Sequence, residues 1–272
     1  MQDYFIFNQP DMMSHYSSSP VPRPENFKMH THEWCEVYYF SEGKGTFKIE
    51  GSSYPLESGD ILLMRPLESH YIDIDPSHRY TRFSAHFDPA ILKGLDPDGY
   101  LMRPFYDREA GKKNLYRASS FKSEIYKSYL KNAVRETENR RLQILSNILP
   151  LLNEISAAFS AGVNETASET LDYKIVNYIN NRLSENITLD EICREFYISK
   201  PHLCRVFKEI TGSTVWDYIT VKRLLNAKML IGSGIKPTKA CGECGFNDYS
   251  TFYRAYVKKF GDASRLTAIP LG

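Results

Sequence analysis

The sequence lacks the features of a secreted or a membrane-spanning protein. No apolar run approaches the ~18 residues that a membrane span requires. The first three residues, Met1-Gln2-Asp3, place an acid where a secretory signal has a basic region. Of the 272 residues, 42% are hydrophobic and 25% are charged, which is typical of a soluble chain that can form two domain cores. We therefore predict a cytoplasmic protein without a membrane partner.

Cysteine is scarce and follows no disulfide pattern. Cys193, Cys204, Cys241 and Cys244 fall in predicted helices, and Cys35 lies far from them in the sequence. Cys241 and Cys244 have the spacing of two thiolates that share a zinc ion, but no second ligand pair follows at zinc-ribbon spacing. We expect the cysteines to be small buried residues rather than a metal or redox site.

Net charge is also low, at +1, but it is unevenly distributed. Residues 171–272 contain 15 Lys and Arg against 10 Asp and Glu, a balance of +5, which leaves −4 for residues 1–170. A basic C-terminal domain next to an acidic partner domain favours nucleic-acid binding at the C-terminal end.

One pattern occurs twice in the last hundred residues: a short amphipathic helix, a tight turn, and a second helix with an exposed arginine. Arg205 and Arg254 lie 49 residues apart, and a glycine, Gly212 or Gly261, follows each arginine seven residues later. Two helix-turn-helix units at a fixed separation suit a protein that reads two successive major grooves of DNA. An ordinary helical bundle would show the same inward stripes, but it does not explain the repeat.

The first unit follows from local signals. Thr188 and Glu191 form a capping box at the start of one helix, and Ser199 is a suitable N-cap for the next. The apolar positions of the two helices are Leu189, Ile192, Cys193 and Phe196, and then Leu203, Val206, Phe207 and Ile210. The opposite face of the second helix carries Pro201, Cys204, Arg205 and Lys208.

The second unit has a well-defined recognition helix but a weaker supporting helix. Its inner stripe is Phe252, Ala255, Tyr256 and Phe260, which leaves Ser250, Tyr253 and Arg254 outside and Tyr249 near the helix start. The supporting helix contains Pro237 and Gly242, and a helical glycine costs ~1 kcal/mol. Residues 215–231 read as one helix between the units, roughly 25 Å long. Its apolar stripe is Tyr218, Val221, Leu225 and Met229.

These residues resemble the AraC/XylS-type transcription regulators over about residues 171–267. Residues 187–212 are similar to the first helix-turn-helix of the family, and residues 245–261 to its second. The resemblance implies DNA contacts from Pro201, His202, Cys204, Arg205, Tyr249, Ser250, Thr251 and Arg254, with Lys208 on a phosphate. An arginine can hold guanine with two hydrogen bonds, worth ~1–3 kcal/mol of discrimination. Because of Pro237 and Gly242, we expect the first unit to supply most of the specificity.

The N-terminal half predicts an all-β sandwich or barrel over about residues 20–90. Short β-rich runs alternate with Gly, Pro, Ser and Asp, at residues 37–40, 45–50, 61–64, 71–74 and 80–87. His30, His32 and Glu36, followed later by His70, resemble the motifs of the cupin barrel. Residues two apart on a strand face the same side, so His30 and His32 are expected to point together into the barrel.

The resembling family often carries a cupin-like domain that senses a small molecule, commonly a sugar. We therefore predict an effector pocket formed by His30, His32, Trp34, Glu36, Tyr38, His70, Tyr71, Arg82 and His86. No metal and no catalysis are expected. The alternatives are a divalent transition metal on His30, His32, Glu36 and His70, or a metal-dependent cupin enzyme fused to a DNA-binding module.

Residues 121–159 are helix-rich and carry a seven-residue spacing of Leu142, Leu145, Leu149, Leu152 and Phe159, interrupted by Ser156. This seam can pair with a second subunit or pack on its own barrel; the resemblance favours a homodimer. Pro150 would bend the helix. Residues 161–170 are small and polar and read as a linker.

The sequence thus predicts an α+β chain with two domains: a cupin-like sensor and dimerisation domain (1–160), the linker (161–170), and an AraC-type DNA-binding domain (171–272). Its predicted function is sequence-specific transcription regulation, in which a small molecule changes promoter binding. Double-stranded DNA, the effector, a second copy of the chain and, for an activator, RNA polymerase are the expected partners.

Overall fold

The computed structural model describes residues 4–163 and 170–261, and the chain divides into two compact units, Met1–Ser168 and Glu169–Gly272. The predicted linker falls at this division, and residues 164–169 of it lie outside the described residues. Each unit has its own hydrophobic clusters. Mixed α and β structure in two units agrees with the predicted fold class.

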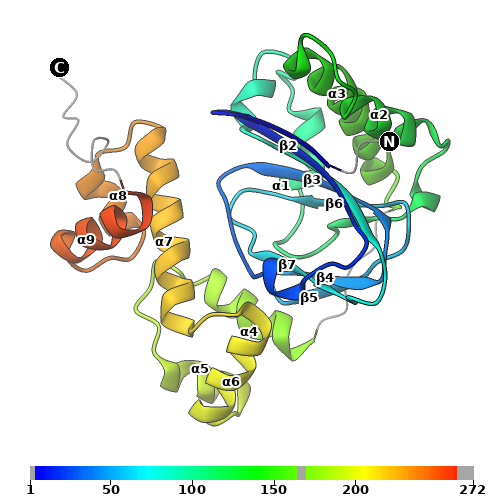
Figure 1. Ribbon diagram of the computed structural model, residues 1–272. Coiled ribbons are helices and arrows are strands. Elements are labelled where there is room, and N and C mark those ends of the chain that lie inside the picture. Colours follow the sequence, from blue (N-terminus) through cyan, green and yellow to red (C-terminus); the bar gives the residue numbers. More distant parts are fainter. Residues whose placement is uncertain (1–3, 164–169, 262–272) are drawn as a thin grey trace. The chain divides into compact units, whose positions relative to one another are not determined.

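The N-terminal unit contains a six-stranded and a three-stranded antiparallel sheet, which face one another (Figure 1). The larger sheet has the order β1 (Tyr4–Gln9), β2 (Met12–Ser19), β8 (Tyr80–Phe87), β3 (Cys35–Glu42), β6 (Asp60–Met64) and β9 (Leu115–Tyr116). The smaller has the order β5 (Ser52–Pro55), β4 (Gly45–Ile49) and β7 (His70–Ile74). The five predicted strands are confirmed, but the expected barrel start at about residue 20 was wrong, because β1 and β2 precede it.

The central strands of the larger sheet, β3, β6 and β8, are buried on both faces, and their side chains alternate between two cores. On β3, Cys35 and Val37 join the cluster under the helices, whereas Tyr38 and Phe40 join the cluster between the sheets. Side chains on a strand alternate in direction, so a strand covered on both sides is apolar almost throughout. The fully buried β6 is such a strand.

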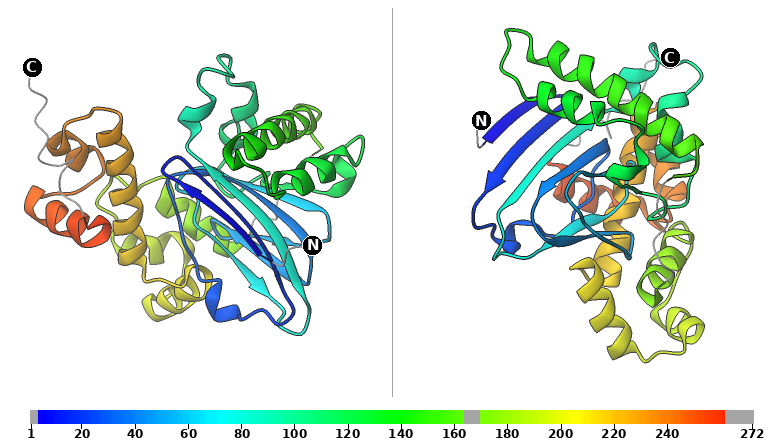
Figure 2. Two further views of the ribbon diagram at one scale, coloured as in Figure 1. Left: turned by 45° about the horizontal axis from the view of Figure 1, so that its top comes forward. Right: turned by 90° about the vertical axis from the view of Figure 1, so that its right-hand side faces the viewer.

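Two helices, α2 (Ile125–Ala133) and α3 (Arg140–Ser160), cover the outer face of the larger sheet (Figure 2). The face of α3 that packs there coincides only partly with the predicted seven-residue seam, since Leu152 is buried in it and Leu142 is not. Its fully buried apolar residues are Ile144, Ile148, Leu151, Leu152 and Ile155. Leu142, on the predicted seam, is 62% exposed, and Leu145, Leu149 and Phe159 are only partly buried. Local packing on the barrel therefore takes most of the apolar surface of α3.

Helix α3 also corrects the expectation that no apolar run is long enough for a membrane span. Its 21 residues pass that test by length and hydropathy, with Pro150 inside the helix. The same residues form part of the core under the larger sheet. A core helix of this length needs no membrane to bury its apolar side.

A buried ion pair fixes the segment before β9 against the rest of the barrel. Arg108 donates from Nη1 to Glu68 Oε1 at 2.6 Å and from Nη2 to Glu68 Oε2 at 2.8 Å. Burial alone would raise the pKa of Glu68, but the guanidinium of Arg108 lowers it to about 2. Asn114 also donates to Glu68 Oε2, at 3.2 Å. This network holds the loop that leads into His70 on β7.

The C-terminal unit is helical and has two cores. Its helices are α4 (Leu171–Asn180), α5 (Leu189–Phe196), α6 (Lys200–Thr211), α7 (Val215–Gly232), α8 (Pro237–Glu243) and α9 (Tyr249–Phe260). Helix α7 runs between the two groups of helices (Figure 1). Val215, Tyr218 and Ile219 of α7 join the first core, and Leu224 and Ala227 join the second.

The predicted single stripe on α7 was therefore wrong. Tyr218 and Leu225 are buried, but Val221 is half-buried and Met229 is 39% exposed. The buried side of α7 changes along the helix because the two cores approach it from different directions.

Candidate functional sites

The first helix-turn-helix unit has the capping that its sequence predicts. Thr188 Oγ1 accepts from the Glu191 amide at 3.2 Å, and Glu191 Oε2 accepts from the Thr188 amide at 2.7 Å. Tyr197 makes the turn in the left-handed region, with φ of 53°. Ser199 caps α6 by accepting from the His202 amide at 3.4 Å. Orphan amides at both helix starts thus have side-chain partners, which defines where α5 and α6 begin.

The outer face of α6 presents the predicted residues to solvent. Pro201, Cys204, Arg205 and Lys208 are exposed, and His202 is half-buried. Arg205 Nη2 donates to His202 Nδ1 at 3.1 Å, so His202 holds the guanidinium on this face. The expectation of a buried Cys204 was wrong, since its position on the outer stripe exposes it. Cys193 is half-buried, and Cys35, Cys241 and Cys244 are buried.

The second unit presents α9 in the same way. Ser250, Thr251 and Arg254 are exposed, whereas Tyr249 is half-buried and packs on Phe252, with ring centroids 5.7 Å apart. Asp248 caps the helix, because its carboxylate accepts from the amides of Ser250 and Thr251 at 3.0 and 2.9 Å. The sequence analysis missed this cap, although Asp immediately before an amphipathic run is a standard signal. The cap stabilises the first turn of α9, which carries the exposed Ser250 and Thr251.

The support for α9 is thin, as the sequence predicts. Helix α8 has seven residues, includes Gly242, and buries Ala240 and Cys241, with Cys244 buried just past its end. A guanidinium on α7 provides a further connection that the sequence did not reveal. Arg223 donates to the backbone carbonyl oxygens of Leu183 and Glu185, in the segment before α5, and to that of Gly245, between α8 and α9.

A cavity of about 420 Å³ lies in the N-terminal barrel between the two sheets. All nine residues predicted for the effector pocket line it: His30, His32, Trp34, Glu36, Tyr38, His70, Tyr71, Arg82 and His86. Their binding role remains a prediction. Alternate residues of β8, from Tyr80 to His86, face this cavity, as the period of a strand requires.

The sequence analysis missed other lining residues, including His15, Phe27 and Tyr80. Arg82 lies over two aromatic rings, with its Cζ atom 5.2 Å from the Phe27 centroid and 5.1 Å from that of Tyr80. Burial, and then the charge of Arg82, lowers the pKa of His15 to about 4, so His15 is neutral near pH 7. Tyr80 and Tyr38 share a hydrogen bond of 2.6 Å between their hydroxyls. The pocket thus combines one cation with aromatic walls and hydroxyl groups.

Four imidazoles and Glu36 gather at one end of the cavity. Glu36 Oε2 lies 3.1 Å from His32 Nε2, 3.0 Å from His70 Nε2 and 3.2 Å from His86 Nε2. Burial opposes ionisation of Glu36, but His86, together with hydrogen bonds from His32 and His70, holds its pKa well below the usual range. His30, His32 and His70 form one group that could hold a metal ion, and His32, Glu36 and His86 form another.

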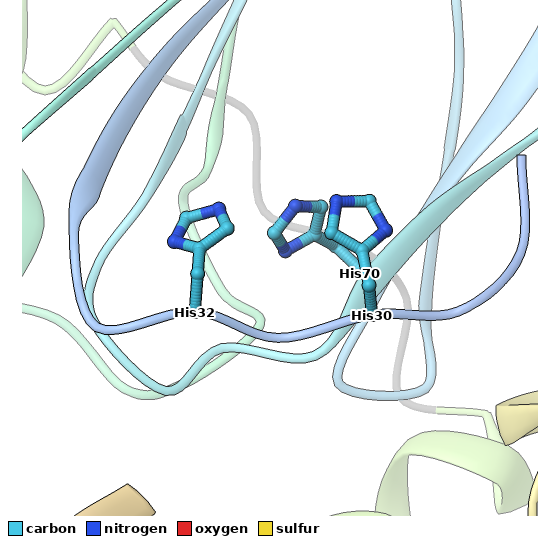
Figure 3. A group of neighbouring side chains, drawn as sticks. All are labelled: His30, His32 and His70. Atoms are coloured by element: carbon cyan, nitrogen blue, oxygen red, sulfur yellow. The ribbon is translucent and has the colours of Figure 1, made fainter. Parts of the chain in front are cut away.

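His30 and His32 reach this cluster from an irregular segment and not from the predicted strand. The backbone of His30 bridges His70, with hydrogen bonds of 3.1 Å from the His30 amide and 2.9 Å from the His70 amide. Figure 3 shows the rings of His30 and His70 side by side, with His32 facing them. The ring centroids of His32 and His70 are 5.0 Å apart. A single backbone bridge therefore brings these rings together.

Comparisons with known proteins match both units. A family model described as an AraC-like ligand binding domain matches residues 23–106, and one described as a helix-turn-helix domain matches residues 192–265. The chain is 24% identical over 230 residues to the uncharacterized HTH-type transcriptional regulator YbfI of Bacillus subtilis (strain 168), covering 83% of this chain and 81% of the relative. It is 25% identical over 249 residues to the HTH-type transcriptional activator RhaR of Escherichia coli (strain K12), covering 86% and 84%.

Among solved structures, ToxT from Vibrio cholerae aligns with a TM-score of 0.40 at 13% identity, covering 94% of this chain and 97% of that one. This likeness is weak. The relation to known proteins therefore rests on the AraC-like ligand binding domain model and the helix-turn-helix domain model. All nine pocket residues lie within the first matched range, and all the predicted DNA contacts lie within the second.

Proposed function

Because the chain belongs to the AraC/XylS-type transcription regulators, we propose that a small molecule bound in its N-terminal barrel controls how its C-terminal unit occupies DNA. The chain has the ligand-binding domain and the DNA-binding helix-turn-helix domain of this family. Its relatives are transcription regulators, so the chain is a regulator and not an enzyme.

The proposed DNA-reading surface is the outer face of α6 together with that of α9. The exposed arginines, Arg205 and Arg254, occupy equivalent places on two capped helices, and Lys208 lies one turn beyond Arg205. A guanidinium can donate two hydrogen bonds to guanine O6 and N7 in the major groove. Each arginine would read one half of a two-groove site.

The proposed effector is a small polar metabolite such as a sugar. The single observation that carries this proposal is that all nine predicted residues surround one cavity of ligand size. Arg82, Glu36 and the imidazoles supply hydrogen bonds to polar substituents, and Trp34 and Tyr71 supply apolar surface. An effector shifts DNA occupancy only if it binds one arrangement of the protein better than another.

We further propose that the regulator is a cytoplasmic homodimer, joined through the side of α3 that carries Leu142, and that it contacts RNA polymerase if it activates. The 62% exposure of Leu142 supports this side as the contact. The rival role for α3, packing on its own barrel, already accounts for its buried side.

The test begins with selection of a binding site from random DNA duplexes by the purified chain. A thermal-shift screen of sugars and related acids then identifies ligands, because a ligand bound only by the folded state raises the melting temperature. The expected result is a hit that changes affinity for the selected duplex by about 5-fold or more, and that Arg82→Ala abolishes. A hit that leaves DNA affinity unchanged would contradict effector control, and absence of any selected sequence would contradict the regulator role.

A further inference from the structure

A second cavity lies on the outer face of the larger sheet, beside α2. Its volume is about 580 Å³, and its lining comes from β1, β2, β8 and β3 and from α2 with the residues that follow it. This is the size of a small-molecule site. The larger sheet separates it from the cavity between the two sheets, because consecutive residues of a strand point to opposite faces. Three neighbouring pairs divide their side chains in this way between the two cavities: His15 and Tyr16, Tyr38 and Tyr39, and Arg82 and Phe83.

A row of aromatic side chains across four strands forms the floor of this second cavity. Phe5 on β1 is the register partner of Tyr16 on β2. Phe83 on β8 is the register partner of Tyr16 on one side and of Tyr39 on the other. Directly opposed residues of neighbouring strands share one face of a sheet, and such strands are about 4.8 Å apart, so this aromatic strip is about 14 Å long. Phe5 and Phe83 are buried, and Tyr16 and Tyr39 are half-buried, so the strip is recessed.

Helix α2 adds an apolar wall with a cationic rim. Leu130 and the C-cap residue Val134 line the cavity one helical turn apart. The next residue after each of them, Lys131 or Arg135, also lines the cavity and is exposed. Within the part of the chain that the structure describes, neither Lys131 nor Arg135 forms an ion pair. Both cations are therefore available to a ligand at the rim.

The other charged residues of the lining already have partners. Lys127 pairs with Glu124, and Glu136 pairs with Arg140 at 3.0 Å. The guanidinium of Arg140 also lies over the ring of Phe5, with its Cζ atom 5.7 Å from the centroid. The charge of the one acid in the lining is thus balanced from outside the cavity. An excess of positive charge remains beside the apolar strip, which is complementary to an anion with an apolar body.

We propose that the second cavity binds an organic carboxylate with an elongated apolar body, either aliphatic or aromatic. The apolar body lies along the aromatic strip, and its burial supplies most of the affinity. The carboxylate lies at the rim, where Arg135 donates paired hydrogen bonds and Lys131 contributes a compact positive charge. This site goes beyond the proposed effector response, because it lies on the opposite face of the larger sheet from the cavity that contains Arg82.

The test measures direct binding to the full-length chain, after passage over a hydrophobic resin to remove amphiphiles that co-purify. Decanoate and cinnamate are titrated separately by isothermal titration calorimetry, below the concentration at which decanoate forms micelles. We expect one ligand per chain and a Kd of about 0.1 mM or tighter for the better of the two. Tighter binding of decanoate would identify an aliphatic ligand, and tighter binding of cinnamate an aromatic one. Decanol and cinnamamide, which lack the charge, should bind about 10-fold more weakly than the matching acid.

Variants separate the charged rim from the apolar strip. The double variant Lys131→Gln, Arg135→Gln should weaken binding of the acid by about 10-fold and leave binding of its uncharged analogue unchanged. Lys93→Gln, Lys122→Gln is the matched control, because it removes the same charge from exposed residues that do not line the cavity. Val134→Phe narrows the cavity and should weaken binding of the acid and of the analogue alike. Circular dichroism verifies that each variant folds.

Three results would overturn the proposal. The first is no binding of either acid at about 1 mM; if Val134→Phe then also separates a dimer in sedimentation experiments, the second cavity is a contact with a second copy of the chain. The second is an equal loss in the control variant. The third is a loss of acid binding in Arg82→Ala but not in the rim variant, which would assign the acid to the cavity between the sheets. DNA selection and the sugar screen are independent measurements, so failure of this site is separate from failure of the regulator function.

Discussion

Arg223 donates a hydrogen bond of 2.8 Å from Nη1 to the carbonyl oxygen of Gly245, which connects α7 to the second helix-turn-helix unit. Its Nε and Nη2 atoms donate to the carbonyl oxygens of Leu183 and Glu185, at 2.6 and 2.7 Å, in the segment before α5. One guanidinium therefore connects the backbone before the first helix-turn-helix unit with the backbone inside the second.

This contact predicts a specific loss in Arg223→Met, which keeps much of the stem but removes the donors. Hydrogen bonds from a charged group contribute ~1.5–3 kcal/mol each, so the two helix-turn-helix units should be held less firmly relative to one another. We expect about 10-fold weaker binding to a duplex with both half-sites, and little change for a single half-site. Fluorescence anisotropy on the two duplexes measures the difference; an equal loss on both would show that Arg223 only stabilises the fold.

A second prediction compares two glycines near each other in sequence. Gly242 lies within α8, and a Cβ there would meet nothing within 4 Å. Gly242→Ala should therefore stabilise the second unit by about 0.4–1 kcal/mol. Gly245 has φ of +82°, and a Cβ there would lie 2.7 Å from the carbonyl oxygen of Ser184, so Gly245→Ala should destabilise it. Hydrogen exchange of the α8 and α9 amides in the full chain reads out both; stabilisation by Gly245→Ala would contradict the packing described.

Arg205 and Arg254 are expected to contribute unequally to DNA affinity. Arg205→Ala should reduce affinity for the selected duplex by about 1–3 kcal/mol, roughly 5- to 150-fold, through lost base contacts. Arg254→Ala should cost less, because α9 rests on a support of seven residues. Arg135→Ala, an exposed arginine of the other unit, is the control. Equal affinity of all three variants and the parent chain would rule out base reading by these side chains.

The buried pair of Glu68 and Arg108 predicts a stability effect that depends on charge. Arg108→Met leaves the Glu68 carboxylate buried without its cation and should lower the free energy of unfolding by ~3–5 kcal/mol. Adding Glu68→Gln should recover part of that loss, since the uncompensated charge is gone. Urea unfolding of the full chain, followed by the fluorescence of Trp34 in a Trp216→Phe background, compares the variants. A double variant less stable than Arg108→Met would exclude this explanation.

The proposed homodimer would form through the exposed side of α3. Leu142→Asp places a charge on that side and should convert a dimer to monomer in sedimentation experiments. Ile125→Asp, at an apolar residue of α2 that is 46% exposed, is the matched control and should leave the dimer intact. If the parent chain is monomeric, or if Leu142→Asp remains dimeric, this side of α3 is not the contact.

Local signals in the sequence predicted the helix-turn-helix units well. Thr188, Glu191 and Ser199 act on amides two or three residues away, so their caps could be read directly. Asp248 belongs to the same class and could have been found. Arg223 could not, because its acceptors lie about 22 and 40 residues away, and only the folded unit brings them to one side chain.

Long-range pairing explains the remaining differences. The β2 sequence ends in three serines and lacks an apolar alternation, yet it forms a strand because β1 and β8 pair with it on both sides. The histidines were correctly grouped, but for an incorrect reason: the bridge from His30 to His70, and not a regular strand, brings them together. On α3, the seven-residue repeat predicted that the leucines form the apolar contact face, whereas packing on the barrel buries Ile144, Ile148 and Ile155.

Because α7 belongs to two cores at once, its length sets both the distance between these cores and their relative rotation about the helix axis. One residue inserted between Ile219 and Leu224 would advance the second core by ~1.5 Å and rotate it by ~100° about the helix axis. Such a change would rotate Arg254 relative to Arg205, so the two arginines could no longer reach the two grooves of the proposed DNA site together. We therefore expect a one-residue insertion or deletion in the middle of α7 to impair binding to a two-groove site.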